Sequence, residues 1–282
     1  MIKGHSNCKI EVVNGNIRKS AKYDEYDLVR FQEQINKHRN FAKKYNNKKD
    51  CPIYIPKILE EGHYCIIEQE PHEDILQFLS YSNEHKIDIL IKQILYFIAD
   101  IVKESSTTKR SIPTIKSKFE KVKLLLKNKN KFTNRQIQKL DDQFGLLFRY
   151  VHNIEIPVGQ AHCDLTLSNI LIHPSHEKIM LIDCLEKSTF IQSPFIDMVK
   201  LRQDTKHKWV YFLDGQKYDK NTIYEKLDYM DKILVKEFKD KYGRWYQQSY
   251  YELLQFINLI RIIPYSKNQE TTNFILKELQ CL

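Results

Sequence analysis

The sequence predicts an α+β protein with two parts, a small N-terminal part rich in strands and a larger C-terminal part that is mainly helical. Short alternating apolar segments and turn signals fill the first seventy residues, around a single helical repeat. From Asp74 onward, apolar residues recur at helical spacing and are interrupted by one short β-hairpin. Residues 68–71, which end in proline, break the pattern, so we expect a lobe at 1–70 and a second lobe at 71–282.

Asn14-Gly15 predicts a tight hairpin between strands at 9–13 and 16–21, because both turn residues tolerate positive φ. With a two-residue turn, Ile10 lies opposite Lys19, which places the lysine on the apolar face of the hairpin. A lysine on a buried face indicates a functional role. The alternative is a surface lysine whose aliphatic stem packs on apolar neighbours.

The remaining elements follow from apolar spacing and from proline and threonine start signals. We expect a helix at 24–44, strands at 53–59 and 64–68, helices at 74–81, 84–104, 113–128 and 133–150, strands at 170–173 and 178–182, and helices at 195–204, 219–241, 244–262 and 268–280.

Composition excludes several classes of protein. The chain has 42% hydrophobic and 29% charged residues, no signal-peptide pattern and no uninterrupted apolar run, so a cytoplasmic protein without a membrane span is expected. Its six cysteines contain no C-x-x-C pair and indicate reduced thiols rather than a disulfide framework or zinc site. Much of the net charge of +9 lies in 103–131 without interleaved aromatic residues, which favours a solvated helix over a nucleic-acid partner.

The most informative stretch runs from His162 to Asn169 and reads H-x-D-L-x-x-x-N, with Asp183 following at the end of an apolar strand. This pattern corresponds to the catalytic-loop and metal-binding signatures of kinases. Asp164 can accept a hydroxyl proton, while Asn169 and Asp183 can hold Mg²⁺ on the phosphates of ATP. The alternative is that these residues only cap a loop and end a strand. The short hairpin that returns the chain to Asp183 favours the chemical role.

The same stretch resembles the aminoglycoside phosphotransferase and choline kinase superfamily, whose members carry H-G-D-L-x-x-x-N-I-L and I-D-[FW]. The likeness continues through residues 169–171 and 193–197. It implies a protein-kinase-like two-lobed fold, ATP and Mg²⁺ as cofactors, and transfer of the γ-phosphate to a hydroxyl of a small molecule such as a sugar, an amino alcohol or an aminoglycoside. Residues 164–171 and 201–204 also resemble bacterial phosphotransferases associated with surface polysaccharide genes.

By position, the resemblance implies that Asp164 is the catalytic base and that Lys19 contacts the α- and β-phosphates. His162 is then a buried residue that shapes the loop. Lys19 should have an acidic partner on the helix at 24–44, which makes Glu33 the expected residue, although Gln34 is the alternative at that place.

Further nucleotide contacts are expected from two places. Residues 4–8, with the Ser6 hydroxyl, occupy the position of a phosphate-covering loop, or else form a frayed terminus. Glu68 and Glu70, in the segment between the lobes, are expected to contribute to nucleotide binding. Glu186 is either an acid near the metals or a solvated surface residue.

Two residues depart from the family pattern. Cys163 stands where glycine is usual, which constrains the loop if that position needs positive φ. Cys184 replaces the aromatic residue after the metal-binding aspartate. Asp197 is expected to be structural, because it opens the next helix.

Two rival functions remain. An atypical protein kinase needs an activation segment and an A-P-E-like anchor, yet only thirteen residues separate Asp183 from Asp197. A nucleotide-binding pseudokinase predicts the loss of a catalytic or metal-binding residue, and none is lost. The acceptor pocket is expected in 211–282, with candidates at Tyr250, Tyr251, Glu252, Arg261 and Tyr265, although aromatic residues at helical spacing are more often core.

Overall fold

The computed structural model describes residues 8–21, 25–108, 111–129, 132–149, 151, 155–186, 191–243, 246, 248–266 and 268–282. The chain divides into two compact units, each assembled from three segments. The first comprises Met1–Ala99, His162–Lys187 and Val210–Lys226, and the second comprises Asp100–Ala161, Ser188–Trp209 and Leu227–Leu282. The predicted boundary near residue 70 falls inside the first unit, because the strands around the H-x-D motif pair with the N-terminal segment.

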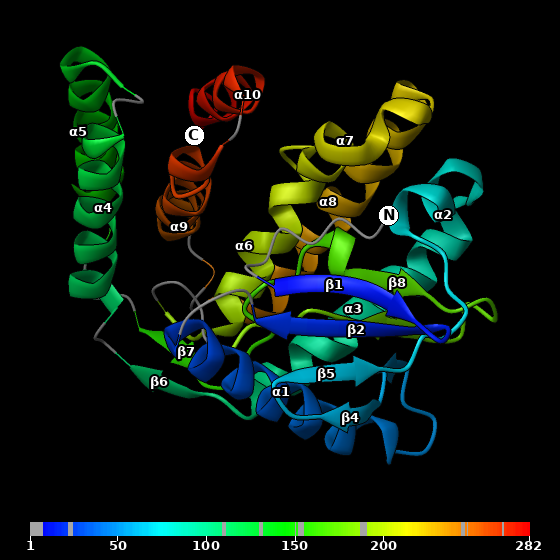
Figure 1. Cartoon of the computed structure of the whole chain (residues 1–282). Helices are drawn as coiled ribbons and strands as arrows, with labels where there is room; N and C mark the ends of the chain where they lie inside the picture. Colours follow the sequence, from blue (N-terminus) through cyan, green and yellow to red (C-terminus); the bar gives the residue numbers. More distant parts are fainter. Residues whose placement is uncertain are drawn as a thin grey trace. The chain divides into compact units, whose positions relative to one another are not determined.

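An antiparallel sheet in the first unit has the order β1-β2-β5-β4 (Figure 1). Its strands are β1 (Cys8–Val13), β2 (Asn16–Ala21), β4 (Ile58–Glu61) and β5 (Tyr64–Ile67). Helix α1 (Glu25–Asn46) packs on one face through Phe31 and Ile35, which share a buried cluster with Cys65 of β5. The sheet and this one helix give the small strand-rich part that the sequence predicts.

The β1–β2 hairpin has the predicted register. Asn14 and Gly15 form the turn with φ of 50° and 76°, and Ile10 pairs with Lys19. Lys19 also pairs with Cys65 of β5, and only 4% of its surface is exposed. Val12, two residues after Ile10 on the same face of the strand, is 60% exposed, because it lies near the turn on the edge strand.

The strand predicted at 53–59 is two strands in the structure. Strand β3 (Ile53–Tyr54) pairs in parallel with β9 (Ile179–Leu181), whereas β4 pairs with β5. Pro56 separates them, because it has no N–H to continue a ladder. Its carbonyl accepts a hydrogen bond from Nε2 of His38 at 2.6 Å. Because of this break, residues 53–61 contribute one strand to each of two sheets.

Strand β9 also pairs antiparallel with β8 (Ile170–Ile172), which makes the hairpin predicted after the H-x-D motif. An isolated bridge joins Ile172 to Glu73, just before α2 (Ile75–Tyr81). Asp74 caps α2 by accepting from Gln77 N at 2.8 Å. Helix α3 (Glu84–Lys103) follows. These pairings bring residues 162–187 into the first unit.

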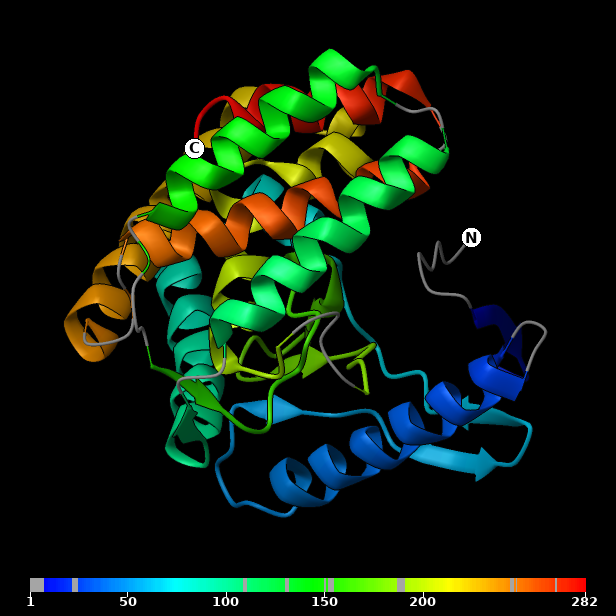
Figure 2. The same cartoon turned by 90° about the vertical axis from the view of Figure 1, so that its left-hand side faces the viewer.

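The second unit is mainly helical. It contains α4 (Ser111–Asn128), α5 (Asn134–Arg149), α6 (Pro194–Thr205), α9 (Gln248–Ile260) and α10 (Gln269–Leu279), with a 3₁₀ turn η3 (Ile263–Tyr265). Helix α9 contacts α4, α5, α6 and α10, and Figure 2 shows it, in orange, beside the two green helices α4 and α5. Phe119 and Phe144 stack at 3.9 Å between ring centroids within this core.

Among the described strands and α-helices, three have no counterpart in the sequence prediction. They are the short strand pair β6 (Ser106–Thr108) and β7 (Ile156–Val158) and the helix α7 (Trp209–Asp214), which precedes α8 (Lys220–Tyr242). Strands of three residues carry too few positions for an alternating pattern to be visible. Within the described part of the chain, no helix is long and apolar enough to cross a membrane.

Candidate active site

The loop that carries Asp164 and Asn169 is fixed by its own hydrogen bonds. Thr166 N donates to the Asp164 carbonyl at 2.7 Å, and Asn169 N donates to the Thr166 carbonyl at 3.0 Å. The Asn169 amide nitrogen donates to the Asp164 carbonyl at 2.8 Å and to its carboxylate Oδ2 at 3.3 Å. Because the amide nitrogen is committed to Asp164, the amide oxygen of Asn169 is the atom left for a cation.

The β8–β9 hairpin returns the chain to this loop, as the spacing predicts. Ile182 N donates to the Asn169 carbonyl at 3.1 Å, and Leu185 N donates to the His162 carbonyl at 3.0 Å. Asp183 lies between these two bonds. Asp164, Asn169 and Asp183 are therefore neighbours in one part of the first unit.

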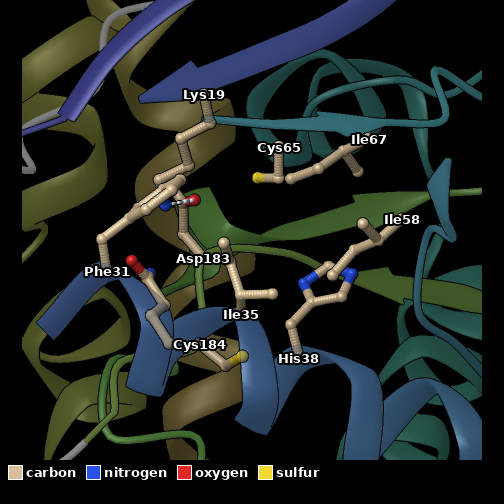
Figure 3. Close-up of a pocket in the computed structure, with 10 residues that line it drawn as sticks. Lys19, Phe31, Ile35, His38, Ile58, Cys65, Ile67, Asp183 and Cys184 are labelled. Carbon is tan, nitrogen blue, oxygen red and sulfur yellow. Dashed lines mark hydrogen bonds and ion pairs between the residues drawn. The ribbon is translucent and has the colours of Figure 1, made fainter. Parts of the chain in front are cut away.

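Lys19 joins the same site from the sheet. Its Nζ lies 2.8 Å from Asp183 Oδ1, and the lysine and aspartate side chains are 5% and 29% exposed (Figure 3). Burial by itself lowers the pKa of Lys19, but the Asp183 carboxylate and its hydrogen bond outweigh that effect, and the pKa is raised. Lys19 is thus a buried, charged ammonium group whose partner is Asp183.

Helix α1 and the sheet enclose a small cavity behind this ion pair (Figure 3). Lys19, Asp183 and Gln34 are among the residues that line it. Gln34 is 8% exposed, and its amide nitrogen has no hydrogen-bond partner within the described chain. Glu33 lies on the exposed side of α1. Of the two expected partners for Lys19, the structure places Gln34 and not Glu33 beside it, since one helical step turns a side chain by about 100°.

Glu68 and Glu70, which were expected between two lobes, lie within the first unit and make different contacts. The Glu68 carboxylate accepts from the Tyr54 hydroxyl at 2.7 Å and from Lys57 N at 3.4 Å, and the Tyr54 hydrogen bond lowers the pKa of Glu68. The Glu70 carbonyl accepts from His72 Nδ1 at 2.7 Å. Both contacts brace the segment, so any nucleotide contact by these residues stays a prediction. Ser6 and the rest of residues 4–7 lie outside the described residues.

Two residues of the site hold left-handed backbone. Cys163 has φ of 70° and Asp183 has φ of 56°. The glycine usual at the first position is therefore explained by geometry, because an L-residue there costs about 1–2 kcal/mol. Cys163 keeps that geometry with a side chain that is only 2% exposed.

His162 fits the predicted structural role. Its side chain is fully buried, and burial lowers its pKa to about 4, so the ring is neutral near pH 7. The ring meets Phe97 edge to face, with centroids 6.4 Å apart. A buried neutral imidazole packed in this way supports the loop rather than carrying protons to solvent.

Sequence reasoning missed two basic residues of α1. Arg30 Nε donates to Glu186 Oε1 at 2.7 Å, and the Glu186 side chain is 4% exposed, so this glutamate is not a solvated surface residue. Lys37 Nζ donates to the Leu185 carbonyl at 2.5 Å. The only sequence signal is their spacing, since 30, 34 and 37 fall on one face of the helix.

Two of the residues expected to line the acceptor pocket are buried and cannot contact a ligand from solvent. Tyr250 and Tyr251 are 0% and 1% exposed within the core of the second unit. Tyr251 packs under the Arg202 guanidinium, which is 4.3 Å from the ring centroid. These two tyrosines belong to the core, which is the usual outcome for aromatic residues at helical spacing. Tyr265, in contrast, is 68% exposed.

The chemistry of the donor atoms fits Mg²⁺ held jointly with a nucleotide. Among the described residues there is no group of three or more His, Cys, Asp or Glu side chains that could hold a metal alone. Mg²⁺ in nucleotide sites needs only one or two protein oxygens in addition to phosphates and water. The Asp183 carboxylate and the Asn169 amide oxygen are atoms of the kind that could supply these ligands.

No protein-family model matches the chain, and no curated protein sequence matches it. Solved structures do match. The ternary complex of APH(2")-IIa with streptomycin and ATP matches with a TM-score of 0.52 at 13% identity, over 100% of this chain and 90% of its own. The ADP-bound aminoglycoside phosphotransferase APH(2'')-Ib gives 0.56 at 13%, over 97% and 90%. Choline kinase LicA from Streptococcus pneumoniae gives 0.55 at 13%, over 100% and 92%. At these identities the likeness shows the fold, and the predicted protein-kinase-like fold is confirmed.

Proposed function

We propose that this protein is an ATP-dependent phosphotransferase that moves the γ-phosphate of ATP to a hydroxyl of a small molecule. The observation that carries the proposal is the assembly of Lys19, Asp164, Asn169 and Asp183 in the first unit from segments up to 164 residues apart. Phosphoryl transfer requires a carboxylate at the attacking hydroxyl, oxygen ligands for the metal and a cation at the phosphates, and these four side chains carry those groups.

Asp164 is the group that accepts the proton of the attacking hydroxyl. It is half-buried, and Asn169 holds one of its carboxylate oxygens, which limits its rotation. Lys19 binds and orients the phosphates. Asn169 and Asp183 hold Mg²⁺, which when bound neutralises charge on the phosphates.

The ion pair between Lys19 and Asp183 is compatible with these roles. Both groups are charged, and each would meet an opposite charge in the nucleotide complex, the lysine at a phosphate and the aspartate at the metal. Their mutual attraction keeps the two side chains in place until a nucleotide arrives. Preorganisation of this kind lowers the cost of ordering the site.

A small acceptor is favoured over a protein acceptor. Thirteen residues between Asp183 and Asp197 are too few for a docking platform for an extended peptide. The solved structures that share the fold include proteins named for aminoglycosides and choline. The likeness of residues 164–171 and 201–204 to polysaccharide-associated phosphotransferases makes sugars the first acceptors to test. A cytoplasmic location, where ATP is available, is part of the proposal.

The test is a coupled ADP-release screen with Mg²⁺ and ATP over sugars, amino alcohols and aminoglycosides. We expect at least one compound to stimulate ADP release by the wild type and not by Asp164→Asn, while both bind ATP. Casein should not become labelled. Phosphorylation of a protein in trans, with no stimulating small molecule, would support an atypical protein kinase instead, and Mg²⁺-dependent nucleotide binding without turnover would support a pseudokinase.

A further inference from the structure

The site contains two strained segments that need external support. Cys163, with φ of 70°, directly precedes Asp164, and Asp183 itself has φ of 56°. An L-residue keeps left-handed backbone only where surrounding contacts determine it. The two strained positions lie on separate segments, so the distance between the proposed base and the proposed metal ligand depends on contacts that join those segments.

One side chain outside both segments contacts each of them. Lys37 of α1 donates from Nζ to the Leu185 carbonyl at 2.5 Å, two residues after Asp183. The same Nζ lies 3.3 Å from Cys163 Sγ, one residue before Asp164. An ammonium group has three donors, so it can serve both acceptors at once.

A second contact from α1 reaches the same chain segment. Arg30 lies two helical turns before Lys37 and donates to Glu186 at 2.7 Å. Lys37 is half-buried, and its Nζ is 5.9 Å from the centroid of the Phe41 ring. Helix α1 therefore holds residues 183–186 at two points, and the Lys37 contact also reaches the catalytic loop.

We propose that Lys37 is a positioning residue of the phosphotransferase site, which sets the spacing of Asp164 and Asp183 by joining the segments that carry them. The inference rests on the proposed function, because it assigns a role within that site. Lys37 acts on the two carboxylates through their chain neighbours Cys163 and Leu185. Its effect falls first on metal binding, since Asp183 holds the metal.

The test compares Lys37→Met with Lys37→Arg and with Lys43→Met, a matched loss of charge at an exposed lysine of the same helix. ATP binding is measured by calorimetry across a Mg²⁺ series, together with basal ATP hydrolysis. Lys37→Met should raise the Mg²⁺ concentration for half-maximal ATP binding by about 10-fold or more, the usual effect of losing a residue that orients a metal ligand. ATP binding without Mg²⁺ should stay unchanged.

Lys37→Arg should recover most of the Mg²⁺ affinity, because guanidinium is also a long cationic donor, and Lys43→Met should equal the wild type. If Lys37→Met does not fold, Lys37→Gln, which keeps a donor but loses charge and length, should show the same shift in smaller degree. Wild-type Mg²⁺ dependence in folded Lys37→Met or Lys37→Gln, or an equal shift in Lys43→Met, would overturn the inference. Failure of the proposed function is distinguishable, because the wild type itself would then lack either Mg²⁺-dependent ATP binding or turnover with every small-molecule acceptor.

Discussion

Replacing Cys163 by glycine and by alanine, in two separate variants, measures the backbone strain in the loop that carries Asp164. Cys184 is the matched control, because its side chain is also buried, at 4% exposure, and its backbone is not among the described left-handed residues. At an ordinary buried position, a variant with glycine has a lower free energy of unfolding than a variant with alanine, for two reasons. Glycine gives the unfolded chain more conformational entropy, which favours unfolding by about 0.4–1 kcal/mol, and it removes a buried methyl group that stabilises the fold by about 0.8 kcal/mol.

These terms predict that Cys184→Gly is about 1.5 kcal/mol less stable than Cys184→Ala. The same two terms apply at Cys163, but glycine also removes the left-handed strain of about 1–2 kcal/mol. The two effects nearly cancel, so Cys163→Gly and Cys163→Ala should have similar free energies of unfolding. Loss of the thiol is common to both variants and does not enter the comparison.

The assay is urea unfolding of the four variants, with free energies of unfolding taken from midpoint and slope. The predicted quantity is the glycine-minus-alanine difference at Cys163 compared with that at Cys184, a contrast of about 1–2 kcal/mol. An equal glycine deficit at both positions would refute the reasoning, because it would mean that Cys163 carries no strain. In that case the departure from glycine at this position would have no energetic consequence.

Three further outcomes follow from the site. Asp164→Asn should leave ATP binding nearly intact and lower turnover by roughly 10²–10⁴-fold, whereas Asp183→Ala should abolish the Mg²⁺ dependence of ATP binding. Calorimetry measures the binding and ADP release measures the turnover, and full turnover in Asp164→Asn would show that Asp164 is not the base. Lys19→Met should raise the KM for ATP and lower kcat, and unchanged values of both would make Lys19 merely structural. His162, whose pKa burial lowers to about 4 from 6.5, binds a proton more readily when the chain is unfolded. The stability that neutral His162 contributes is therefore complete above about pH 6.5 and falls by up to about 3 kcal/mol as the pH is lowered toward 4. Urea unfolding at pH 7 and at pH 5 should detect this loss of stability, and a His162→Gln variant should not show it.

Local signals in the sequence determined the register of the N-terminal hairpin and the grouping of the residues around the H-x-D motif. Asn14-Gly15 defined the turn, and a two-residue turn leaves one register, so the sequence by itself placed Lys19 on the buried face of the hairpin. The spacing of Asp164, Asn169 and Asp183 around a short hairpin likewise predicted that these residues lie close together, as the hydrogen bonds of the loop show. These inferences succeeded because each depends on residues within about twenty positions, where backbone geometry alone restricts the outcome.

Only the tertiary structure decided the features that depend on distant contacts. Whether Glu33 or Gln34 accompanies Lys19 depends on the rotation of α1 against the sheet, and a shift of one residue changes the answer. Arg30 and Lys37 act on residues more than 120 positions away, and no local pattern marks a surface-like lysine as the partner of a distant carbonyl. Pro56 shows the same limit: the sequence predicts one strand at 53–59, and the sheet that each half joins on either side of Pro56 is set by partners elsewhere in the chain.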